Sequence, residues 1–134
     1  MNSFRRFLLL PIITVIFFSG VSCTPITITP DTHPNIVPLG KLSFVQVQDV
    51  KNRREGDKLQ AHVSLLNSNR KSETIYYRFK WLDSDGLAIG DEPVWKTETF
   101  FGEQSKVING STTNSAAIDF TLELASGKAK PLRN

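Results

Sequence analysis

The chain has 134 residues, which allows one small domain. Its formal net charge is +3, but two of its 16 basic residues, Arg5 and Arg6, lie at the very start. The other 14 basic residues nearly cancel the 13 acidic ones, so the body of the protein lacks the positive field that nucleic-acid binding requires. One cysteine and two histidines exclude an internal disulfide and a typical zinc site.

The first 22 residues have the pattern of an export signal. Arg5 and Arg6 precede an apolar run at 7–18, and small residues follow at 19–22. As a helix, the run would span about 18 Å, which is too short for a bilayer core of about 30 Å. We therefore expect residues 1–22 to be a cleaved signal peptide.

The single cysteine, Cys23, directly follows this segment. The sequence Gly20-Val21-Ser22-Cys23 resembles a bacterial lipobox, in which the cysteine is diacylated and becomes the mature N-terminus. Gly20 departs from the usual Leu, and Gly20 with Ser22 also fits the small-x-small site of the ordinary signal peptidase. We expect lipidation at Cys23, by palmitate-type acyl chains that enter the lipid bilayer. Cleavage after Ser22 without lipidation is the alternative.

Residues 23–40 are predicted to form a tether. Prolines at positions 25, 30, 34 and 38 disfavour both helix and strand. In an extended conformation of about 3.1 Å per residue, the segment would reach roughly 50 Å. His33 lies within it without a second ligand nearby, so we expect no metal role. The predicted function of this segment is to hold a folded domain off the membrane.

From 41 to 125 the chain shows the period-two alternation of β-strands. Strands are expected at 41–50, 59–65, 75–82, 87–89, 94–101, 105–108 and 117–124. A bulge is expected near Phe44, and turns at 52–57, at 83–86 and at Asn109-Gly110. Residues 126–134 have no apolar period and are predicted to be a flexible C-terminal tail.

Six or seven short strands separated by turns predict an all-β domain, an Ig-like antiparallel β-sandwich. The central strand is 75–82, where large apolar residues alternate with more polar ones. The predicted core consists of eight residues: Val63, Leu65, Ile75, Tyr77, Phe79, Trp81, Phe120 and Leu122.

The sequence contains little that predicts catalysis. His62 alternates outward in the strand at 59–65, and a Ser/His/Asp arrangement would have to use His62 or His33. The spacing of Asp83, Asp85 and Gly86 does not fit a calcium loop. We predict that the protein is not an enzyme and has no catalytic residue, metal or cofactor. The alternative is a small-ligand-binding or hydrolytic envelope protein that uses His62.

Exposed apolar side chains are the candidate contacts with a partner. Tyr76 and Leu82 are apolar residues on the solvent-facing side of the central strand, which is otherwise polar. Trp95 lies in the strand at 94–101. Phe100 and Phe101 are consecutive, and we expect both to be exposed, which is a rare apolar exposure within a strand. These five residues, together with open sheet edges, predict a binding or scaffolding module.

Residues 77–87, YRFKWLDSDGL, resemble the Y-R-F-x-W-x-D-x-x-G-L signature of the YcfL family of small envelope lipoproteins. The similarity continues through 106–111 and 118–124 and covers roughly the latter half of the chain. It implies an Ig-like β-sandwich in the Gram-negative periplasm. Thr24, where an Asp would favour retention, suits sorting to the outer membrane. The expected partner is an envelope protein or a component of peptidoglycan assembly. The resemblance supplies no functional residues.

Overall fold

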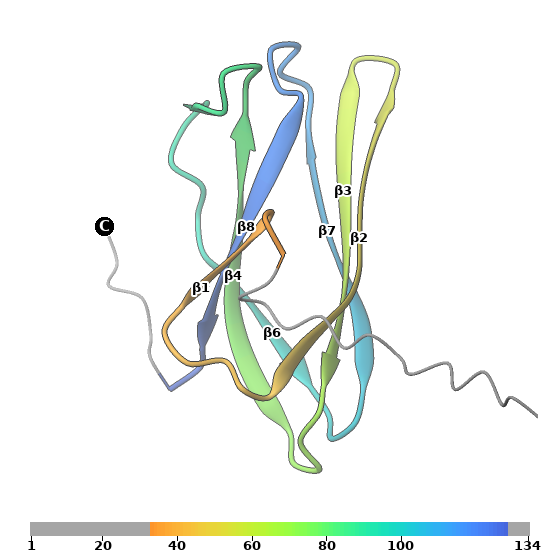
Figure 1. Cartoon of the computed structure of the whole chain (residues 1–134), viewed down its shortest axis with the longest axis vertical. Helices are drawn as coiled ribbons and strands as arrows, with labels where there is room; N and C mark the ends of the chain where they lie inside the picture. The colour runs from red at the N-terminus through yellow and green to blue at the C-terminus, as the bar shows by residue number, and fades with distance from the viewer. Residues whose placement is uncertain (1–32, 129–134) are drawn as a thin grey trace, which may run out of the picture.

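The structure is a computed structural model that describes residues 33–128 (Figure 1). The predicted signal peptide, Cys23 and residues 24–32 of the predicted tether lie outside this range, as do residues 129–134 of the predicted tail. Within the described range no helix is long and apolar enough to cross a membrane.

Eight strands make up the described part of the chain. They are β1 (Ile36–Leu39), β2 (Val45–Glu55), β3 (Lys58–Asn67), β4 (Glu73–Leu82), β5 (Ala88–Ile89), β6 (Lys96–Phe100), β7 (Ser105–Thr112) and β8 (Asp119–Ser126). One sheet has the order β2-β3-β7 and is called sheet A below. Sheet B has the order β1-β8-β4-β5, with β6 also paired to β4. The two sheets face each other (Figure 1), which confirms the predicted all-β sandwich.

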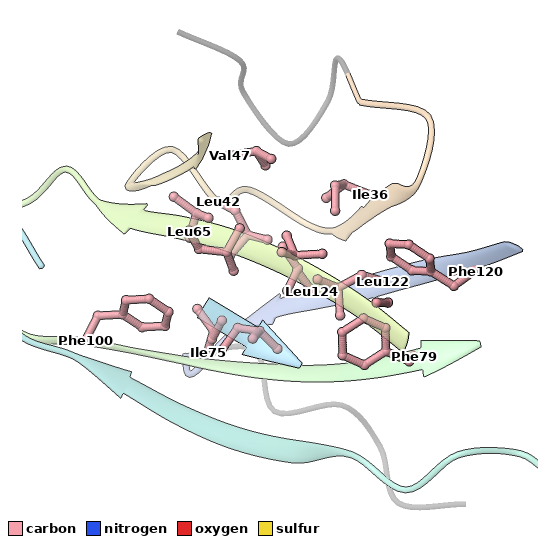
Figure 2. Close-up of a cluster of buried hydrophobic side chains, with 14 of the residues drawn as sticks. Ile36, Leu42, Val47, Leu65, Ile75, Phe79, Phe100, Phe120, Leu122 and Leu124 are labelled. Carbon is pink, nitrogen blue, oxygen red and sulfur yellow. The ribbon is translucent and has the colours of Figure 1, made fainter. Parts of the chain in front are cut away.

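The core lies between the sheets and is centred on β4. Ile75 and Phe79 are buried, while Tyr77 and Trp81 are half-buried and pack against the core cluster. The Phe79 ring centroid lies 5.6 Å from that of Phe120 on β8 and 6.1 Å from that of Trp81. Figure 2 shows the buried side chains of both sheets pointing toward one another. All eight predicted core residues belong to this cluster or pack against it.

The end of the predicted tether is a strand, so that boundary was wrong. β1 pairs with β8 in parallel, from Ile36 opposite Leu122 to Leu39 opposite Ala125. Pro38 is tolerated because β1 is an edge strand and needs no donor on its outer side. Just before β1, the Asn35 side chain donates to the Phe120 carbonyl at 2.6 Å and extends the pairing. The domain therefore begins before residue 41.

β2 also differs from the expectation. It begins at Val45 and runs to Glu55, so the turn predicted at 52–57 is confined to Gly56 and Asp57. The bulge predicted near Phe44 lies between Val47 and Asp49, where the register against β3 shifts.

The predicted tight turn at Asn109-Gly110 was wrong, because both residues lie within β7. Gly110 pairs with Ala61 of β3, and its missing side chain makes room for the Phe79 ring of the opposite sheet. A Cβ at Gly110 would lie 2.6 Å from Phe79 Cδ2. The glycine therefore serves a close approach between the sheets.

Replacing Gly110 by alanine should overpack this contact. We expect Gly110→Ala to lower the free energy of unfolding by about 1–3 kcal/mol, measured by urea denaturation. The exposed neighbour provides the control, because Ser111→Ala should change stability by no more than about 0.5 kcal/mol. Equal stability of the two variants would show that the Phe79 ring does not depend on the glycine.

Candidate binding site

A gap on one edge of β4 produces the main recess of the described domain. β6 pairs with residues 73–77 of β4, and β5 pairs with Trp81 and Leu82. On that edge, residues 78–80 have no paired strand, because the chain at 90–95 leaves the sheet. A pocket of about 250 Å³ opens there.

The pocket has walls of different chemistry. Aromatic Phe79 and Trp81 line it from sheet B, and polar Thr112 and Asn114 line it from the end of β7 and the loop after it. The remaining lining residues are Lys80, Ala88, Ile89, Gly90, Asp91, Glu92 and Pro93. The volume is below the 300–1,000 Å³ that is usual for small-molecule pockets, so it suits one side chain or a small fragment.

Exposed apolar side chains flank the wall at 88–93 in the sequence. Leu87 precedes it and is 64% exposed, and Val94 follows it and is 82% exposed. Sequence reasoning identified neither residue as a contact. One feature of the sequence marks these residues. The segments on either side of Gly90-Asp91-Glu92-Pro93 are too short to continue a strand beside β4.

Four charged side chains hold the outer side of this wall to sheet B. Arg78 lies opposite Glu123 of β8 in the ladder, and its Nε lies 2.5 Å from Glu123 Oε2. Its Nη1 lies 2.5 Å from Glu92 Oε1. Lys80 Nζ bridges both carboxylates, at 3.0 Å from Glu123 and 3.5 Å from Glu92. The network therefore fixes the loop without ladder hydrogen bonds.

The Arg78–Glu123 pair at the centre of the network is largely shielded from water, which strengthens it. The side chains of Arg78 and Glu123 are only 12% and 13% exposed, and the Trp95 ring lies 4.5 Å from the Arg78 guanidinium carbon. Burial alone would raise the pKa of the Glu123 carboxyl, but hydrogen bonds and charge from Lys80 and Arg78 outweigh it. The pKa of Glu123 consequently lies below its usual value.

The five predicted partner contacts do not form one surface. Tyr76 and Leu82 are half-buried on the same side of β4 as Arg78, where Trp95 covers the guanidinium. Phe100 is only 2% exposed and packs in the core, so the expectation that it is exposed was wrong. The physical reason is the strand parity of β6, which turns Phe100 inward. Phe101 is 65% exposed but follows β6 at the opposite end of β4 from Leu82.

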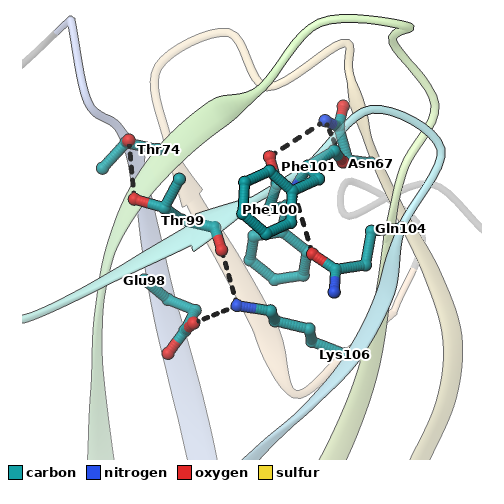
Figure 3. Close-up of polar contacts among 8 residues, drawn as sticks. All are labelled: Asn67, Thr74, Glu98, Thr99, Phe100, Phe101, Gln104 and Lys106. Atoms are coloured by element: carbon teal, nitrogen blue, oxygen red, sulfur yellow. Dashed lines mark hydrogen bonds and ion pairs between the residues drawn. The ribbon is translucent and has the colours of Figure 1, made fainter.

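The loop that carries Phe101 is held by side chains (Figure 3). Buried Asn67 donates to the Phe101 carbonyl at 2.9 Å and to the Lys71 carbonyl at 2.8 Å. The Phe101 amide donates to Gln104 Oε1 at 2.9 Å. Lys106, which points inward from β7, bridges Glu98 and the Thr99 carbonyl at 2.6 Å each. This corner joins the sheets and fixes Phe101 at a distance from the pocket.

The histidines lie apart from the pocket. His62 pairs across the ladder with Asn109 on the outer side of sheet A, and its Nδ1 lies 2.7 Å from Asn109 Oδ1. His33 Nδ1 accepts a hydrogen bond from the backbone N–H of Asn35 at 3.2 Å. Among residues 33–128, no group of His, Cys, Asp and Glu side chains is arranged to hold a metal ion.

The lowered pKa of Glu123 makes a pH-dependent contribution to stability. The contribution is complete above the ordinary value of 4.5 and is lost as the pH falls through the lower folded-state pKa. We expect Glu123→Gln to cost about 2 kcal/mol at neutral pH, and the difference from wild type should shrink below about pH 4.5. Urea denaturation at a series of pH values measures it.

The matched control is Glu103→Gln, because Glu103 and its partner Arg70 are largely exposed. It should change stability little at any pH. If the difference between wild type and Glu123→Gln is independent of pH, the carboxylate is not stabilised by its two cationic neighbours.

Three comparisons place the chain among known proteins. A search of curated proteins finds no significant match. A crystal structure of a DUF1425 family member from Shewanella sp. pv-4 is similar to this chain, with a TM-score of 0.57 and 24% identity. The match covers 72% of this chain and 89% of that one. The crystal structure of Campylobacter jejuni cj0090 is also similar, with a TM-score of 0.53 and 22% identity. This match covers 60% of this chain and 84% of that one. Residues 42–126 match a family whose description is "Protein of unknown function (DUF1425)", and the chain belongs to that family.

Proposed function

We propose that the chain is a lipoprotein of the YcfL type, anchored in the outer membrane through acylated Cys23 and facing the periplasm. Its support is the N-terminal sequence, in which an export signal at 1–22 precedes Cys23 and Thr24. Fully extended, the segment from Cys23 to Ile36 would reach roughly 40 Å, so the sandwich would work close to the bilayer.

We further propose that the sandwich is a binding or scaffolding module for another envelope component, such as a protein or part of peptidoglycan assembly. The observation that carries this is the gap beside β4. Residues 78–80 have no paired strand on that edge, and a pocket opens where the chain leaves the sheet. Exposed Leu87 and Val94 flank the pocket wall at 88–93 in the sequence. Exposed apolar groups around a recess are typical of contact sites.

Addition of a partner strand to either edge of sheet A is less favoured by the geometry. The edge strand β2 carries a bulge and ends in the charged sequence Lys51-Asn52-Arg53-Arg54-Glu55. The edge strand β7 turns Lys106 inward. Bulges, charges and inward-pointing lysines are the devices that keep edges from pairing with other chains. The pocket, with exposed Leu87 and Val94 on either side of its wall in the sequence, is therefore a better contact than the edges of sheet A.

The hydrolytic alternative receives no comparable support. His62 lies on the surface of sheet A with an amide as its side-chain partner, and a general base is normally oriented by a carboxylate or a backbone carbonyl. We therefore favour binding over catalysis.

The anchor has a direct test. Cys23→Ser should abolish incorporation of radiolabelled palmitate and move the protein from the membrane fraction to the soluble fraction, or leave the signal unprocessed. Ser22→Thr keeps the cysteine and serves as the control for altered processing. Unchanged membrane association of Cys23→Ser would contradict the anchor.

The contact site is tested by photo-crosslinking in intact cells. A photoreactive amino acid at Leu87 or Val94 should trap a defined neighbour. The same amino acid at Val107, an exposed apolar residue on sheet A, should not. A Tyr76→Ala, Leu82→Ala double variant should also weaken the adduct if the outer side of β4 takes part. Adducts at Val107 alone would place the contact on sheet A and contradict the proposed site.

A further inference from the structure

We propose that the pocket beside β4 receives one cationic side chain, a lysine or arginine of a polypeptide partner. The inference rests on the proposed binding function and names the chemistry that the same site would recognise. Charge, acceptor groups, aromatic lining and size each support it.

The charges around the pocket leave one carboxylate unpaired. Glu92 is neutralised by Arg78 at 2.5 Å, and Lys80 lies between Glu92 and Glu123. Asp91 is exposed and lines the pocket, and it forms no ion pair within residues 33–128. The site therefore carries a residual negative charge, which attracts a cation and repels an anion.

The polar walls present acceptors. Thr112 Oγ1 accepts one hydrogen bond, from the backbone N–H of Asn114. The side-chain oxygen of Asn114, Oδ1, accepts one from the backbone N–H of Ala116. A hydroxyl oxygen and an amide oxygen each have two lone pairs, so each retains one for a ligand. An ammonium or guanidinium has donors only, and it would meet these oxygens and the Asp91 carboxylate.

The apolar walls suit the stem of the same side chain. Phe79 and Trp81 line the pocket, and an aromatic ring, indole above all, attracts a nearby cation. Ile89 and Pro93 offer apolar surface to the methylene groups. A volume of about 250 Å³ accommodates one long side chain but not a drug-sized ligand. Exposed Leu87 and Val94 would then contact apolar residues beside the basic one.

The experiment compares two peptides against the full chain in detergent micelles. One is acetyl-Leu-Ala-Lys-Ala-Leu-amide, and the other has norleucine, which is uncharged, in place of lysine. Binding is followed by NMR through the backbone amides of 88–93 and the Trp81 indole N–H. We expect the lysine peptide to shift these signals saturably at millimolar concentration and the norleucine peptide to need a several-fold higher concentration for the same shifts, because it keeps the apolar contacts but lacks the charge. Raising the salt concentration should weaken the effect.

Two isosteric variants identify the carboxylate. Asp91→Asn should lower the affinity for the lysine peptide about three- to fivefold, as is usual for an exposed ion pair. Asp85→Asn removes an equally exposed carboxylate that does not line the pocket, and it should change nothing. Both substitutions are on exposed loops, so both variants should remain folded.

The possible failures can be told apart. Equal shifts from both peptides, or no effect of Asp91→Asn, would overturn the basic occupant, while crosslinks at Leu87 and Val94 would still support the binding function. Shifts confined to residues elsewhere would overturn the pocket as the cation site. If the lysine peptide binds as expected but no crosslink forms in cells, the cation site stands and the proposed role as an envelope docking module fails.

Discussion

The structure depends on β4, which has neighbours on both edges but is left incomplete on one of them. Its inward side chains form the aromatic centre of the core, and its outward side chains carry the ion network. Along one edge, pairing with β6 stops at Tyr77 and pairing with β5 begins at Trp81. The unpaired stretch is the origin of the pocket, because the chain at 90–95 must pass around it.

The core and the pocket meet at Phe79. On one side its ring packs against Gly110, where the absence of a Cβ allows the two sheets to approach. On the other side it lines the pocket together with Thr112, which lies two residues beyond Gly110 on β7. The recess therefore lies next to the close approach between the two sheets.

The alternation of side chains in the sequence predicted the sandwich and its core correctly, because burial on one side of a strand repeats with period two. It could not separate Phe100 from Phe101, since the parity of a short strand is set by its partner. Asn109-Gly110 is typical of turns, and only the Phe79 ring on the opposite sheet explains it as strand. The pocket was missed because Asp91 and Asn114 are brought together by pairing between segments distant in the sequence.

The ion network replaces the hydrogen bonds that the gap removes. In a complete sheet the loop at 90–95 would be a strand held by its backbone; here Arg78 holds it through Glu92, and Trp95 covers the guanidinium. Side chains hold a loop in a chosen position while leaving its own backbone and its free carboxylate, Asp91, available to a ligand. A wall fixed in advance costs less conformational entropy when a partner binds than a wall that must be ordered. The charges of Arg78, Lys80 and Glu123 on the outer side of sheet B thus hold the pocket wall in position through Glu92.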